Sequence, residues 1–150
     1  MPDTSPIAPY RQAWRCGFPN VVLQATLGSA TKQPDYAAAK AGDIQASYRL
    51  AKALVNDEKV AELERIIGNL RPVLIPVHAE ESVSINRIPL AYAYVMGERL
   101  RLPVELNIVQ AAKVSRTGAD GFTRLAWPPP FYGEPEDNSG YGIVLVAVKK

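Results

Sequence analysis

The spacing of apolar and polar positions first predicts a helical region in residues 35–70. From Asp57 to Leu70 the apolar residues recur at helical spacing, with charged residues outside the stripe. The stripe is Val60, Leu63, Ile66 and Ile67. Gly68 is suited to the C-cap of this helix because glycine adopts the left-handed conformation readily.

Two shorter helices are predicted before it. Asp35 is expected to cap an alanine-rich turn that ends at Gly42, and Asp43 to cap a second helix that runs to Asn56. The expected apolar face of the second helix is Ile44, Tyr48, Ala51 and Val55. We interpret Tyr48 as a packing residue.

Short apolar runs predict four strands: 20–27, 73–77, 104–110 and 141–148. Between the second and third strands, Pro89 suits the first turn of a helix over 90–100, which Pro103 ends. Ala91, Ala93 and Gly97 are small enough for this helix to lie close to a sheet. Strand, helix, strand in this order predicts a right-handed parallel crossover.

Composition fits one soluble globular domain, residues 1–150. Residues 1–12 contain Pro2, Pro6 and Pro9 and are expected to be extended or disordered. Residues 13–70 are expected to hold one strand and the helices, and residues 71–150 an α/β core.

Charge and cysteine content limit the expected partners, disulfides and cellular location of the protein. The net charge of +2 gives no specific nucleic-acid signal, and no apolar run is long enough to span a bilayer. The single Cys16, expected to be buried or half-exposed, excludes an intrachain disulfide. The N-terminus lacks the pattern of a signal peptide, so a cytoplasmic location is predicted.

The stretch from Arg71 to Val146 resembles type I phosphoribosyltransferases. The residues that carry the resemblance are VLIPVHAEESVSINRIPLAYA, then KVSRTGADGFTRLA, then GIVLV. The resemblance implies an α/β fold with a parallel sheet and a Rossmann-like core, preceded by N-terminal helices. It also implies a pyrophosphate-binding loop at 79–87 and a mobile basic loop that contains Lys113, Arg116 and Thr117.

One departure from the family pattern concerns the last strand. In the family this strand runs into two acidic residues and a phosphate-binding loop, whereas here Ala147 and Val148 occupy the acidic positions. The core is therefore expected to be incomplete at its C-terminus. Without the loop that binds phosphoribosyl pyrophosphate (PRPP), we expect little or no transferase activity.

Candidate binding residues cluster in the two loops, and each has a structural alternative. Seven residues are predicted to bind pyrophosphate or a similar anion: Ser82, Ser84, Asn86, Arg87, Lys113, Arg116 and Thr117. The first three can instead supply the cap of the following helix, and the basic loop can simply be exposed. His78 is either a general base or a histidine bonded to the backbone or exposed to solvent. We interpret Glu80 and Glu81 as a solvated pair rather than as a metal site. No residue is assigned as a metal ligand or as a catalytic residue.

Two functions follow as expectations. The first is a phosphoribosyltransferase-like domain that binds phosphate, pyrophosphate or PRPP. It has no evident cofactor, and Mg²⁺ would accompany PRPP or pyrophosphate if the family activity were retained. The second is a non-enzymatic interaction module that forms a homodimer or pairs with a protein partner through an exposed sheet edge.

Overall fold

The structure is a computed structural model that describes residues 16–17, 21–78, 87–110, 131–133 and 142–145. The helical elements are a 3-10 turn at Ala30–Lys32, then α1 (Tyr36–Lys40), α2 (Ile44–Leu54), α3 (Asp57–Ile67) and α4 (Ile88–Leu100). The strands are β1 (Val73–Pro76), β2 (Val109–Gln110), β3 (Phe131–Tyr132) and β4 (Gly142–Leu145).

Side-chain caps fix where α2 and α3 begin. Asp43 accepts a hydrogen bond from the Ala46 backbone N–H at 2.7 Å, and Asn56 accepts one from the Lys59 N–H at 3.1 Å. Each bond satisfies a donor that the first helical turn leaves free. Gly68 ends α3 with a φ of +56°. The predicted caps of α2 and α3 at Asp43 and Gly68 are therefore confirmed.

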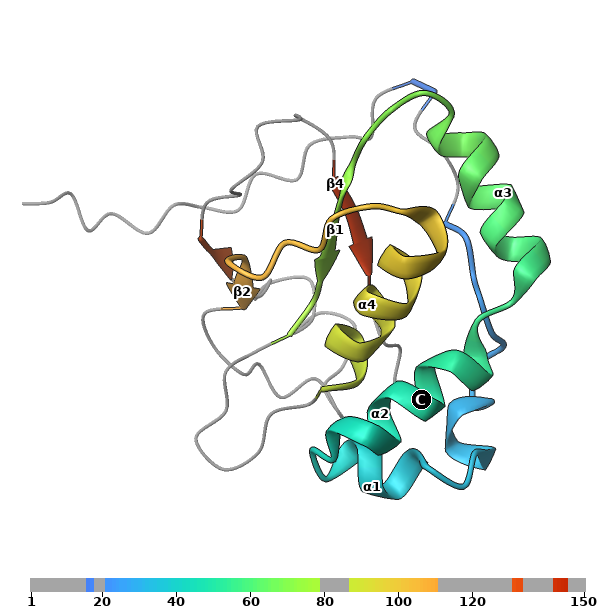
Figure 1. The fold of residues 1–150 in the computed structure, drawn as a ribbon, viewed down its shortest axis with the longest axis vertical. Helices are drawn as coiled ribbons and strands as arrows, with labels where there is room; N and C mark the ends of the chain where they lie inside the picture. Colours follow the sequence, from blue (N-terminus) through green and yellow to red (C-terminus); the bar gives the residue numbers. More distant parts are fainter. Residues whose placement is uncertain (1–15, 18–20, 79–86, 111–130, 134–141, 146–150) are drawn as a thin grey trace, which may run out of the picture.

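Helix α4 is the central element of the described structure, because it contributes to all three apolar clusters. The first cluster joins α4 to α3 and β1 through Val60, Leu74, Met96 and Leu102. The second places Ile88 against α1 and α2, and the third packs Ala91 and Val95 on Ala51 of α2. A helix with apolar residues on most sides is expected to be buried. Figure 1 shows α4 between the strands β1 and β4 on one side and α2 and α3 on the other.

A close contact holds α4 against the segment that follows it. A Cβ placed on Gly97 would lie 3.0 Å from the Leu102 carbonyl oxygen and 3.1 Å from Val104 Cγ2. The expectation that small residues let this helix approach the strands is confirmed at Gly97. The helix ends at Arg101, which has a left-handed φ of +55°.

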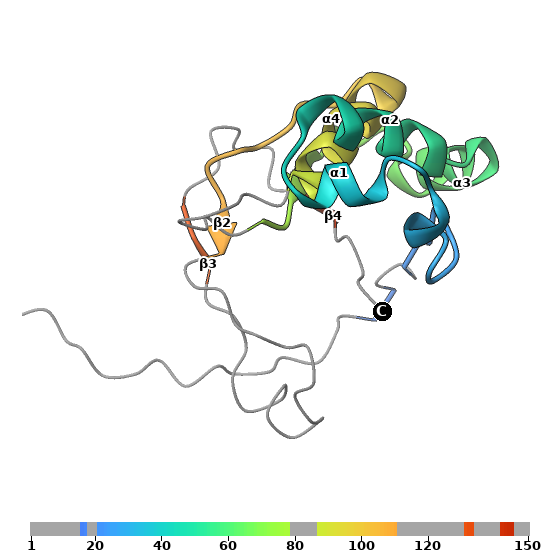
Figure 2. The ribbon, with the colours of Figure 1, turned by 90° about the horizontal axis from the view of Figure 1, so that it is seen from below.

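The predicted parallel-sheet, phosphoribosyltransferase-like fold is wrong for the described residues. Helices dominate, and the strands form two ladders of two strands each, β1–β4 and β2–β3. β1 and β4 do run parallel, with Val73 opposite Gly142 and Pro76 opposite Leu145, but no third parallel strand joins them in this part of the chain. Seen from below, the helices lie together on one side of these strands (Figure 2).

The failure of the predicted strand at 104–110 has a local cause. Glu105 N–H donates to the Leu74 carbonyl at 2.8 Å, which gives one parallel bridge between Leu74 and Val104. The Glu105 carboxylate accepts a hydrogen bond at 2.7 Å from the backbone N–H of Asn107, two residues further on. The chain bends at Asn107. Such a side-chain to backbone bond competes with a strand ladder. Only Val109 and Gln110 then form β2, which pairs antiparallel with β3.

Three further expectations in the N-terminal half are wrong. Residues 21–27 form no strand, and Val21, Leu23 and Leu27 are exposed. Apolar β-branched residues favour a strand only where a neighbouring strand and a core accept them. Ile44 is exposed on α2, and the Asp35 carboxylate bonds Arg49 rather than the first turn of α1.

Replacement of Gly97 by valine should destabilise the protein. The added Cβ would lie 3.0 Å from the Leu102 carbonyl oxygen, which is closer than an ordinary van der Waals contact. We expect Gly97→Val to lower the free energy of unfolding by about 2 kcal/mol, the usual cost of overpacking. Urea unfolding would measure the change. Ala61→Val, on the exposed face of α3, is the control for valine in a helix. Equal losses in the two variants would contradict the close contact.

Removal of the Asp43 cap should weaken α2. We expect Asp43→Ala to cost about 1 kcal/mol of stability, because the Ala46 N–H loses its acceptor. Thermal or urea unfolding would measure the change. Gln45→Ala, at an exposed site in the first turn of the same helix, should change stability by much less. An Asp43→Ala variant with the same free energy of unfolding as the wild type would show that the cap does not stabilise α2.

Candidate functional site

The carboxyl end of β1 is the edge where the sequence predicts a ligand. β1 and β4 end there together because they run parallel and Pro76 lies opposite Leu145. The chain leaves β1 through Val77 and His78 and is described again from Arg87, where α4 begins. Ligands in α/β proteins bind at such strand ends, next to the positive end of a following helix.

His78 is fixed to the backbone at this edge. Its Nδ1 lies 3.0 Å from the Pro76 carbonyl oxygen, and its own carbonyl accepts from the Gln110 N–H at 2.9 Å. The ring is half-buried. Of the two interpretations of His78, the structure confirms the hydrogen bond to the backbone. A general-base role stays a prediction.

Arg87 is the predicted site residue that the structure describes. It occupies the N-cap position of α4, is half-buried, and makes no side-chain cap bond to the helix. Pro89 lies in the first turn, as predicted. The alternative that Ser82, Ser84 or Asn86 caps this helix concerns side chains outside the described part of the chain, and it stays a prediction.

The other predicted site residues lie outside the described part of the chain. They are Ser82, Ser84 and Asn86 in the first loop, and Lys113, Arg116 and Thr117 in the basic loop. Glu80 and Glu81 also lie outside it. The structure therefore neither brings these residues together nor separates them.

Charged side chains elsewhere pair with each other on the surface. Arg49 contacts Asp35 at 2.6 Å, and this bond holds the pKa of the Asp35 carboxyl below its ordinary value and raises that of Arg49. Lys59 pairs with Glu62 at 2.7 Å, which lowers the pKa of Glu62. Both pairs are exposed, so each contributes little to stability.

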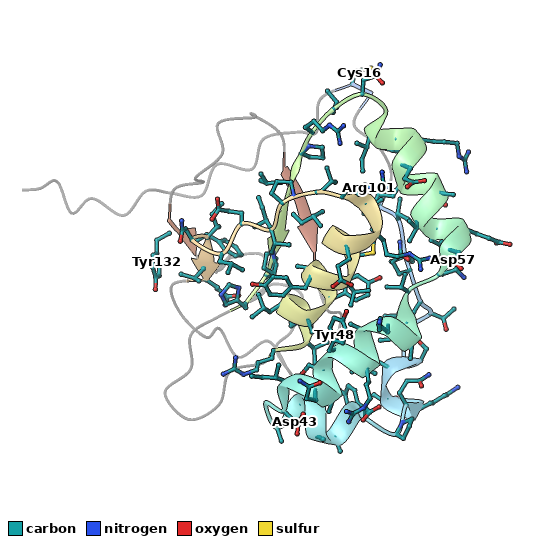
Figure 3. All side chains as sticks on the ribbon, viewed as in Figure 1. Cys16, Asp43, Tyr48, Asp57, Arg101 and Tyr132 are labelled. Atoms are coloured by element: carbon teal, nitrogen blue, oxygen red, sulfur yellow. The ribbon has the colours of Figure 1, made fainter. Side chains whose placement is uncertain are left out.

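A polar contact also links α2 to the central helix. The Tyr48 hydroxyl donates to the Glu98 carboxylate at 2.9 Å, while its ring packs against the α2–α4 cluster. Lys52 Nζ lies 5.0 Å from the centre of the same ring. Figure 3 shows Tyr48 between the two helices. The interpretation of Tyr48 as a packing residue is confirmed.

Sequence reasoning missed the buried hydroxyl of Tyr92 and the buried carboxylate of Glu105. The Tyr92 hydroxyl on α4 is buried and has no hydrogen-bond partner in the described structure, and burial raises the pKa of this phenol far above its usual range. Glu105 is 5% exposed and accepts from the Asn107 N–H. The sequence does carry a signal for Glu105, because it is a glutamate inside a strand-like apolar run. A carboxylate buried there needs hydrogen-bond donors close by.

A hollow of about 330 Å³ lies at the other end of β1. It is lined by residues at the end of α3, by the link to β1 and by the end of α4: Glu64, Ile67, Gly68, Asn69, Leu70, Arg71, Leu100 and Leu102. Arg71 precedes β1, so the hollow adjoins the amino end of the strand. It is therefore separate from the predicted ligand edge.

No metal-binding group emerges among the described residues. Within them, no three His, Cys, Asp or Glu side chains gather closely enough to hold an ion. Cys16 is exposed, which corrects the expectation of a buried or half-exposed residue. None of the helices in the described ranges has the length and apolar content that a bilayer crossing requires.

Comparison with known proteins places the chain beside two longer bacterial proteins. It is 48% identical over 136 residues to an uncharacterized protein of Haemophilus influenzae (strain ATCC 51907 / DSM 11121 / KW20 / Rd), a match that covers 90% of this chain and 30% of the relative. It is 45% identical over 127 residues to Protein TraN of Escherichia coli, which covers 85% of this chain and 28% of the relative. The chain thus spans less than a third of each relative.

The other comparisons add no family. No family model matches the chain, and no solved structure matches it significantly. The names of the two relatives do not refer to a phosphoribosyltransferase, and that resemblance stays a prediction. What the comparisons establish is sequence similarity to part of two larger proteins.

Proposed function

We propose that the β1–α4 unit binds a small anion of the phosphate class, as one part of a larger protein. The observation that carries the proposal is that α4 is the next described element after β1, with the cation Arg87 at its N-cap. A guanidinium and a helix N-terminus both attract phosphate oxygens.

The three longer helices differ in the side chain that occupies their N-cap position. In α2 and α3 a backbone N–H of the first turn donates to the side chain of Asp43 or Asn56, so each of these helices has a capping acceptor from its own chain. At α4 the N-cap side chain is a cation that makes no such bond. Ile88 in the first turn already has a bonding partner, so the proposal rests on the positive charge of Arg87 and of the helix dipole, which an anion would complement.

Pro89 limits the strength of this site. Proline has no N–H, so the first turn of α4 offers one backbone donor fewer than an ordinary helix. Arg87 therefore supplies the main directional contact, because its planar guanidinium can donate two parallel bonds to one phosphate. The expected affinity is modest.

Catalysis is not part of the proposal. The sequence lacks the acidic pair that the phosphoribosyltransferase resemblance requires, and the described fold lacks that family's sheet. Binding of PRPP with Mg²⁺ and a cytoplasmic location stay predictions. The predicted contribution of Lys113 and Arg116 to the anion site likewise stays a prediction.

Titration with inorganic pyrophosphate tests the anion site. We expect the amide signals of Leu90 and Ala91 to shift at millimolar ligand, because they lie in the first turn of α4. Arg87→Gln should weaken binding about tenfold, the usual effect of losing a charge-assisted bond to phosphate. Arg65→Gln, on the exposed face of α3, is the matched control. Unmoved signals in the wild type, or equal effects of the two variants, would contradict the proposal.

A second candidate function is self-association, which one surface favours. Phe131 and Tyr132 on β3 are 49% and 52% exposed, and Leu106, three residues before β2, is 43% exposed. Figure 3 shows Tyr132 directed away from the helices. Strand edges with exposed apolar side chains favour pairing with another chain, here a second copy.

Sedimentation equilibrium tests this second function. We expect a homodimer whose dissociation constant rises when Tyr132→Ser removes an exposed ring from β3. Tyr94→Ser, at a tyrosine 46% exposed on α4, is the control. A strictly monomeric mass at millimolar concentration would contradict self-association, and equal effects of both substitutions would contradict the β3 surface.

A further inference from the structure

The hollow at the amino end of β1 is large enough for a small ligand. Its volume is about 330 Å³. Small-molecule sites in proteins occupy roughly 300–1,000 Å³, so this hollow lies at the lower end of that range. Its size therefore fits a ligand no larger than a single amino acid or a molecule of similar dimensions.

Two opposite charges line this hollow without neutralising each other. Glu64 comes from the last turn of α3, and Arg71 from the link that enters β1. Within the described ranges, neither the Glu64 carboxylate nor the Arg71 guanidinium has a hydrogen bond or an ion pair. Both groups are therefore available to a ligand that carries a complementary charge.

The inner side of the hollow is apolar. Leu102 is 7% exposed and belongs to the core cluster around Met96, and Ile67 and Leu100 pack against the same cluster. Leu70, which also lines the hollow, is 44% exposed. An aliphatic group placed here would leave water and contact side chains that the core already holds in position.

The helix ends at the hollow favour a cation on the Glu64 side. Ile67 and Leu100, the last residues of α3 and α4, both line it, and both helices end on the side of the molecule where the chain enters β1 (Figure 1). The carboxyl end of a helix carries the negative pole of its dipole. Arg99 in the last turn of α4 pairs with Asp57 instead of lining the hollow.

We infer that this hollow binds an amino acid with an aliphatic side chain, in its zwitterionic form. The ligand carboxylate accepts two parallel bonds from the Arg71 guanidinium, and the ligand ammonium donates to the Glu64 carboxylate. The aliphatic side chain packs against Ile67, Leu100 and Leu102. Arg71 is the one cation among the described residues that line the hollow, which fixes the direction in which the ligand lies. The inference does not depend on the anion site at the other end of β1.

Titration of the wild-type protein with leucine and two of its analogues tests the ligand class. Isocaproate lacks the ammonium group, and isoamylamine lacks the carboxylate. We expect leucine at millimolar concentration to shift the amide signals of Gly68, Asn69 and Leu70. Each analogue should bind about tenfold more weakly, because one charge-assisted contact is lost. Unmoved signals with leucine, or equal affinities for all three compounds, would overturn the inference.

Two substitutions assign the ligand's charged groups to the residues that hold them. We expect Glu64→Gln to lower the affinity for leucine about tenfold and to leave that for isocaproate unchanged, because isocaproate has no ammonium group. Arg71→Gln should weaken leucine and isocaproate alike and leave isoamylamine unchanged. Glu58→Gln and Arg65→Gln, at exposed sites on α3 outside the hollow, are the matched controls. Leucine binding that the two hollow variants change no more than the controls do would overturn the assigned site.

Discussion

Burial of α4 is the constraint on which the described structure depends. The helix contacts α2 through Ala91 and Val95, α3 and β1 through Met96, and its own following segment through Gly97. Removing these apolar groups from water is the main favourable contribution to folding. Because α4 is held on several sides, the position of its first turn relative to β1 is also fixed. The proposed anion site therefore depends on the core for its geometry.

The helices could be predicted from the sequence because each carries its own signals. Asp43, Gly68 and Pro89 mark helix ends through local chemistry, and no distant partner is needed to interpret them. The strands could not be predicted in the same way. A strand forms only beside a partner strand, and the local pattern of residues does not show whether one is present. Val21 and Leu23 look like strand residues but are exposed without a neighbouring strand. At 104–110 the Glu105 carboxylate takes the Asn107 N–H and bends the chain where apolar spacing favoured a strand.

The strand and the helix on either side of the proposed site could be predicted from the sequence, but the roles of individual side chains there could not. The end of β1 and the start of α4 lie where the strand-loop-helix pattern places them, and Arg87 is half-buried at the junction. The pattern could not indicate that Arg87 is the N-cap residue. It also could not place the Pro76 carbonyl beside His78, because that bond depends on the backbone path after β1.

Native-state hydrogen exchange of the α4 amides tests the central role of this helix most directly. Buried elements exchange only when the whole domain unfolds, whereas exposed ones exchange through local opening. The account predicts that Ala93, Val95 and Met96 exchange at the rate of global unfolding, and that amides on the exposed face of α3 exchange much faster. Exchange of the α4 amides as fast as those of α3 would contradict it.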